Sequence, residues 1–242
     1  MILRHPRCKI GTDQGDRQLS WLEFAAVFVA FFLTHSIPTR PRVRARLIAL
    51  FGARGYLIGY STLSTVMLAV LIVAARHAPF VLLWPQAIWQ HHVVLAGMFG
   101  VCLILAFSLG APNPFSFGGA HNDRFDPAHP GIVRWTRHPI LLALLLWAAL
   151  HLLPNGDLAH VLLFGVFALF AGLGRWLINR RKMREMTPTH WAALDASVRA
   201  SPLFRLPTSA GWALARFAAA VLIYGALLIF HSYIIGVNVV AI

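Results

Sequence analysis

Acidic side chains are scarce in this sequence, which has eight Asp and Glu among 242 residues, against 21 Lys and Arg. Only 12% of the residues are charged, about half the usual share of a soluble domain, whereas 58% are hydrophobic. So few charges do not cover the water-facing surface of a chain this long. The basic excess does not indicate a nucleic-acid partner, because the arginines cluster between apolar runs, as they do in membrane loops.

Cysteine is also rare, and the common catalytic motifs are absent. Cys8 and Cys102 lie far apart and share no motif, which excludes a disulfide framework and disfavours a zinc site built on thiolates. The sequence has no GxSxG, P-loop, HExxH or CxxC pattern, so nothing supports a hydrolase, an ATPase or a zinc protease. Residues 1–20 are polar and have no apolar core, unlike a signal peptide, and are interpreted as a mobile N-terminal extension.

Long apolar runs are abundant, and several reach the roughly 17–25 residues that a membrane-spanning helix needs. The sequence therefore predicts an all-α protein, a polytopic transmembrane helical bundle with about six spans. The expected spans are Trp21–Pro38, Tyr56–Ala75, His91–Gly110, Pro139–Leu153, Asp157–Ile178 and Gly211–Gly236. The fourth is short, and a Pro-Asn-Gly tip at 154–156 joins it to the fifth as a tight hairpin.

Basic residues predict the orientation, because they favour the cytoplasmic side. They concentrate in three predicted loops, 39–55, 111–138 and 175–210, whereas the 76–90 loop, the 154–156 tip and the C-terminus have few or none. This pattern places the three basic loops in the cytoplasm and both termini in the periplasm. The N-terminal extension, which also carries Arg and Lys, argues against that placement.

Histidines are the informative ionisable residues of the apolar segments, where charge is costly and usually functional. His35 extends a helical stripe of phenylalanines, which is suited either to the wall of a flat cofactor site or to contact with lipid. His151 follows Trp147 and Ala148 by one turn, which leaves room for a planar group. The alternative for His151 is a helix-packing histidine that is bonded to a backbone carbonyl.

The sequence Arg134-Trp135-Thr136-Arg137-His138-Pro139 predicts an anion site. Proline suits the first turn of a helix, whose free N–H groups and positive dipole end attract anions, and two arginines add full charges. A carboxylate or a haem propionate would fit there. The alternative is a basic helix start that only sets the topology. His138 and His151 are 13 residues apart, about 20 Å along a helix, so they do not ligate one metal.

The chain resembles the NnrU family of membrane proteins and the related 15-cis-zeta-carotene isomerase. The stretches that carry this resemblance lie within residues 21–210 and include THSIPTRPRVRARL, ARHAPFVLLWP and RWTRHPILLALLLWAALHLLPNGD. The most specific feature is Arg-His-Pro followed by a histidine 13 residues later. Residues 21–210 are accordingly expected to form an NnrU-like membrane domain, and 211–242 an additional C-terminal transmembrane helix.

The resemblance implies a protein of the bacterial inner membrane that supports nitrite and nitric oxide reduction, with reductase components as possible partners beside the lipid bilayer. The isomerase that the chain resembles is a haem b enzyme. The resemblance implies that its histidines correspond to His35, His77, His138 and His151. Of these, His35 and His151 resemble its iron ligands, which implies haem b as the cofactor. Ala148 replaces the isomerase's cysteine, which argues against a redox ligand switch and against isomerase activity on carotenes. Other isomerase-like haem chemistry stays open.

Two alternatives remain open. Isoprenylcysteine carboxyl methyltransferases also carry Arg-His-Pro before a membrane hairpin, and Glu185 and Trp191 fall in a comparable charged stretch, although the usual tyrosine pattern is missing. This resemblance implies an enzyme that uses S-adenosylmethionine. The other alternative is a non-enzymatic assembly factor for a reductase. The sequence does not decide whether the protein is an enzyme.

Overall fold

The computed structural model describes residues 18–204, 207, 209–237 and 239. Over these residues the chain forms α-helices and two short 3-10 helices, and no β-strand. The predicted all-α class is therefore confirmed. The chain divides into two compact units, Met1–Phe80 and Val81–Ile242, which are described separately. The predicted N-terminal extension falls, up to residue 17, outside the described residues.

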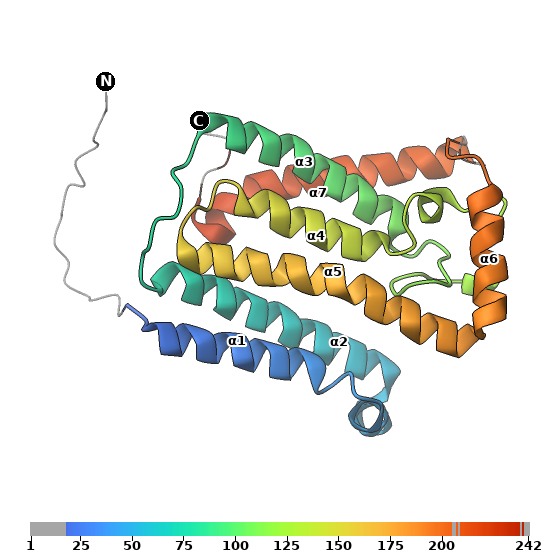
Figure 1. The fold of residues 1–242 in the computed structure, drawn as a ribbon, viewed down its shortest axis with the longest axis horizontal. Coiled ribbons are helices and arrows are strands. Elements are labelled where there is room, and N and C mark those ends of the chain that lie inside the picture. The colour runs from blue at the N-terminus through green and yellow to red at the C-terminus, as the bar shows by residue number, and fades with distance from the viewer. Residues whose placement is uncertain (1–17, 205–206, 208, 238, 240–242) are drawn as a thin grey trace. The chain divides into compact units, whose positions relative to one another are not determined.

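The first unit is a pair of packed helices, α1 (Trp21–Ser36) and α2 (Pro41–His77) (Figure 1). A capping box starts α1, in which the Ser20 hydroxyl accepts from the Glu23 N–H and the Glu23 carboxylate accepts from the Ser20 N–H. Phe24 and Phe31 of α1 are buried. Part of the predicted phenylalanine stripe thus packs inside the protein.

The predicted loop at 39–55 is instead helical from Pro41 onward. Pro41 is well placed at the first helical position, and the Arg, Ala and Leu residues that follow are strong helix formers. Gly52 interrupts this helix with a φ of +71°, which L-residues with a side chain rarely adopt, and it kinks α2 into two arms (Figure 1). The arm before Gly52 carries Arg42, Arg44 and Arg46, and the arm after it contains Arg54 and the predicted span.

The second unit contains α3 (Ile88–Ser108), α4 (Pro139–Leu152), α5 (Leu158–Met186), α6 (Pro188–Ala200) and α7 (Ala210–Ile235). Helix α4 packs against both α3 and α5, and α7 packs against α3. The shorter α6 crosses one end of this bundle (Figure 1). The predicted loop at 111–138 is irregular apart from two 3-10 turns, η1 (Asn122–Arg124) and η2 (Gly131–Arg134).

The Pro-Asn-Gly tip between α4 and α5 is held by the segment that precedes α3. The Gly156 carbonyl accepts from the N–H groups of Leu83 and Trp84 at 2.7 and 3.2 Å. The Trp84 indole donates to the Leu153 carbonyl, and the Gln86 amide to the Pro154 carbonyl. A Cβ on Gly156 would lie 2.0 Å from the Trp84 carbonyl oxygen, so only glycine fits at the tip.

Four helices among the described residues are long and apolar enough to cross a membrane, namely α2, α3, α5 and α7. They include four of the six predicted spans. Helices α1 and α4 are apolar but have only 16 and 14 residues. The described residues therefore establish a helical protein suited to a lipid bilayer.

Candidate functional site

The Arg-His-Pro motif stands where the 111–138 connection enters α4. His138 is the N-cap residue and Pro139 the first helical residue, as the sequence predicts. The Thr136 hydroxyl accepts from the His138 N–H, at 3.3 Å, and so closes the turn before the helix. The Asn113 side chain donates to the Arg137 carbonyl at 3.0 Å and holds this turn against the start of the connection.

His138 is buried, with 2% of its surface exposed, and both of its ring nitrogens have partners. Nε2 lies 2.8 Å from the Asn179 carbonyl oxygen of α5, and Nδ1 lies 3.0 Å from the Ser116 hydroxyl. A neutral ring with its proton on Nε2 satisfies both contacts, because the amide oxygen only accepts and the hydroxyl can donate. Burial is the main factor that lowers the pKa of His138, and Arg175 and Arg137 lower it further, whereas the Asn179 hydrogen bond opposes the shift.

Arg137 reaches from the motif to α6. Its guanidinium forms an ion pair with the buried carboxylate of Asp195 through Nε and Nη2, and it lies 5.0 Å from the ring centre of Trp191. Asp195 accepts a second arginine, Arg199, at 2.9 Å on its other oxygen. The Asp195 carboxylate thus joins the start of α4 to α6, and each of its two oxygens accepts from one guanidinium group.

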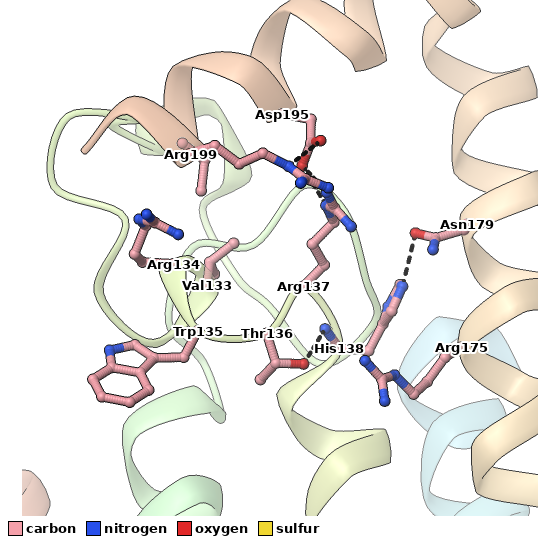
Figure 2. A pocket seen from close by; sticks show the side chains of 11 residues that line it. Val133, Arg134, Trp135, Thr136, Arg137, His138, Arg175, Asn179, Asp195 and Arg199 are labelled. Atoms are coloured by element: carbon pink, nitrogen blue, oxygen red, sulfur yellow. Dashed lines mark hydrogen bonds and ion pairs between the residues drawn. The ribbon is translucent and has the colours of Figure 1, made fainter. Parts of the chain in front are cut away.

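A cavity of about 270 Å³ opens among these side chains (Figure 2). Its polar lining comes from the motif, from α5 and from α6, and consists of Arg134, Thr136, Arg137, His138, Arg175, Asn179, Asp195 and Arg199. Four arginines and one aspartate, with His138 neutral, give this basic pocket a net charge of +3. It also lies at the N-terminus of α4, where the helix dipole favours an anion. The predicted anion site residues Arg134, Arg137 and His138 therefore do come together.

The comparison with protein families agrees with the motif. The model of the NnrU protein family matches residues 23–239, nearly the whole chain. The chain belongs to the NnrU family. The match includes α7 and so extends beyond the 21–210 stretch in which the motifs lie. No curated protein and no solved structure matches this NnrU family member.

His35, one of the two predicted iron ligands, lies in the first unit and is engaged by α2. Its Nδ1 is 3.3 Å from the Ser64 hydroxyl, and its Nε2 is 3.3 Å from the Tyr60 hydroxyl. The ring also stacks on Phe31, with 5.6 Å between the centres. In this arrangement both nitrogens have partners, so ligation of iron by His35 would require Tyr60 or Ser64 to move.

His151 lies in the second unit, in the last turn of α4, and keeps one nitrogen available. Its Nδ1 donates to the Trp147 carbonyl at 2.8 Å, as both sequence interpretations allow. The lone pair is then on Nε2, which has no hydrogen-bond partner within the described part of the chain. The rings of Trp147 and Phe164 lie 5.2 and 5.3 Å away. His77 likewise donates from Nδ1 to the Val73 carbonyl, at the end of α2.

The described residues contain no group of three or more His, Cys, Asp or Glu side chains able to hold a metal ion. A haem iron takes only two axial ligands from a protein, so it needs no such group. His151 fits a neutral axial ligand whose other nitrogen is oriented by a carbonyl, whereas His138, with both nitrogens engaged, does not.

Sequence reasoning missed half of the basic pocket. Asn179 is 41 residues from His138, and Asp195 is 58 residues from Arg137, so no local motif connects them. A weak signal does exist, since Arg175 and Asn179 share one face of α5 at a spacing of four, as do Asp195 and Arg199 on α6. Glu185, singled out beside Trp191, lies elsewhere and pairs with Arg181 and Lys182.

Buried His138 predicts an acid-sensitive stability. Its pKa is lowered in the folded protein, so its contribution is complete above the pKa of about 6.5 in the unfolded chain and is lost as pH falls through the lower folded value. We expect the melting temperature of the wild type to drop more between pH 7.5 and pH 5 than that of His138→Gln, which does not titrate. Equal slopes for the two proteins would contradict this account.

Proposed function

We propose that this NnrU family protein spans the bacterial inner membrane six times and binds a small anion in the basic pocket, on the cytoplasmic side. The spans are α1 to α5 and α7, and the three basic segments predicted from the sequence face the cytoplasm, with both termini in the periplasm. The 14 residues of α4 rise about 21 Å, less than the roughly 30 Å of a hydrocarbon core. Helix α4 therefore crosses the core only together with the residues that flank it.

The charge of the basic pocket carries this proposal. Asp195 is already shared by Arg137 and Arg199. Among the described residues, Arg134 bonds through its Nε alone, to the Ser201 carbonyl at 2.7 Å. Arg175 lines the pocket without a hydrogen bond or ion pair to any described residue. A cluster of cations with so little internal compensation is stabilised by an anion, and a guanidinium matches a carboxylate or phosphate in two-point geometry.

The volume of the basic pocket favours a small anion over S-adenosylmethionine, the ligand of the methyltransferase alternative. Pockets for drug-sized ligands hold roughly 300–1000 Å³, and the basic pocket, at about 270 Å³, lies at the lower limit. The volume and the net charge of +3 both favour a compact anionic group. Among the described carboxylates, Asp195 is the one in the pocket and is already paired, which leaves no unpaired carboxylate for the ammonium and sulfonium charges of that cofactor.

The proposal predicts that Arg175→Ala weakens the binding of inorganic phosphate about tenfold, as expected for the loss of one charged hydrogen bond. Isothermal titration of the purified full chain, at constant ionic strength, measures this. Arg184→Ala is the matched control, because Arg184 is an exposed arginine of the same helix outside the basic pocket.

Equal loss in both variants would show only a diffuse attraction and would contradict a pocket. A parallel titration with S-adenosylmethionine tests the methyltransferase alternative. If S-adenosylmethionine binds tightly and His138→Ala abolishes that binding, the methyltransferase alternative is supported and the small-anion proposal is refuted.

Haem b binding is the second candidate, and the free Nε2 of His151 supports it. The Nδ1–H bond to the Trp147 carbonyl fixes the ring, and Trp147 and Phe164 offer aromatic faces beside it. A bound haem would supply a redox-active iron. His151 is about 20 Å along α4 from His138, farther than a haem iron lies from its propionates. Arg134 and Arg137 would therefore not hold the propionates of a haem on His151.

For the haem candidate, we expect a Soret band after haem-replete expression and its loss in His151→Ala. His160→Ala is the control, because His160 lies just beyond the same hairpin tip with its Nδ1 on Asp157. A wild-type protein without a Soret band would refute haem binding, and a band that survives His151→Ala would refute the ligand.

The support of nitrite and nitric oxide reduction remains part of this proposal, as the family resemblance implies. Anion binding, haem binding and service as a reductase assembly factor are compatible with it. Co-purification with reductase subunits, retained when His35, His138 and His151 are all alanine, would favour the assembly role over ligand chemistry.

A further inference from the structure

A second, larger cavity adjoins the basic pocket within the same unit. It measures about 1010 Å³ and is lined by α3, α7 and the connection before α4. Its lining surface is mostly apolar and includes Leu103, Ile104, Phe107, Leu142 and Trp212. The charged side chains of the lining are Arg124, Asp126, Arg134 and Arg216. We refer to it as the apolar groove. By its volume and composition it suits a hydrocarbon chain rather than a polar metabolite.

The two cavities share a wall. Val133, Arg134, Trp135 and Thr136 line both the basic pocket and the apolar groove. Figure 2 shows Arg134 and Trp135 on one side of Arg137, with Arg175 and Asn179 on the other. Trp135 is 60% exposed and packs edge-on against Phe204, with 4.9 Å between the ring centres. A single ligand can therefore place an anionic group in the basic pocket and an apolar chain in the apolar groove.

Contacts between α3 and α7 hold the walls of the apolar groove in place. Arg216 of α7 donates to the carbonyls of Ala106 and Leu109 at the end of α3, at 2.7 and 2.5 Å, and lies over the Trp212 ring. Phe107 and Trp212 meet edge to face across the two helices, with 5.7 Å between their centres. The groove is thus a built feature between two helices that we assign to the bilayer.

We propose that the ligand of the basic pocket is the head group of a membrane lipid with a phosphate monoester, whose hydrocarbon chain lies in the apolar groove. This inference rests on the proposed anion pocket and names its ligand class. A net charge of +3 matches the double charge of a phosphate monoester better than the single charge of a diester.

Native mass spectrometry of the full chain in detergent tests this with three probes. Phosphatidic acid has head and chain, glycerol 3-phosphate has the head alone, and phosphatidylcholine has the chains with a zwitterionic head. We expect phosphatidic acid to bind at least about tenfold more tightly than either of the others. Arg175→Ala should weaken both phosphate monoesters.

A variant that fills the groove separates the two cavities. Ile104→Trp should weaken phosphatidic acid about tenfold and leave glycerol 3-phosphate unchanged, and retained binding of the soluble probe shows that the variant is folded. Leu173→Trp, on an exposed surface of α5, is the matched control. Equal affinities for phosphatidic acid and glycerol 3-phosphate would overturn the lipid inference and leave the anion pocket intact. Binding of phosphatidylcholine as tight as that of phosphatidic acid would also overturn it, and no binding of any phosphate monoester would overturn both.

Discussion

The ion pair between Arg137 and Asp195 is the contact on which the rest of the site depends. It joins the turn before α4 to α6. Helix α6 also packs on the connection before α4 through a buried cluster of Phe115, Val133 and Val198, and the ion pair adds a polar link with a defined direction. A buried ion pair gains little net stability, because desolvation offsets much of the attraction. Its additional partners, Arg199 on the carboxylate and Trp191 against the guanidinium, make it a fixed geometric restraint.

That restraint explains why the basic pocket keeps a surplus of positive charge. Asp195 is used twice, so it holds α6 in place without neutralising Arg134 or Arg175. His138 is neutral, and both of its ring nitrogens are hydrogen-bonded, so it lines the pocket in a fixed position without adding a charge. The anion that we propose would balance this charge, and the apolar groove beyond Arg134 would place its hydrocarbon chain.

Hydropathy was sufficient to predict the apolar helices, because the length of an apolar run limits where a helix begins and ends. The predicted start of α4, Pro139, is its observed first residue. The basic segment after Pro41 is helical rather than the expected loop, because arginine favours helices although its charge lowers the hydropathy. In the site, Arg134, Arg137 and His138 are adjacent in sequence and could be found. Asn179 and Asp195 could not, because tertiary packing alone brings α5 and α6 to the motif.

Replacement of Asp195 by asparagine tests most directly whether geometry or charge governs the site. The change raises the net charge of the basic pocket by one, which by electrostatics alone should tighten phosphate binding. If Asp195 instead holds Arg137 and α6 in position, phosphate binding weakens despite the added charge. We predict weaker binding of inorganic phosphate to Asp195→Asn than to the wild type in isothermal titration. Tighter binding would contradict the account.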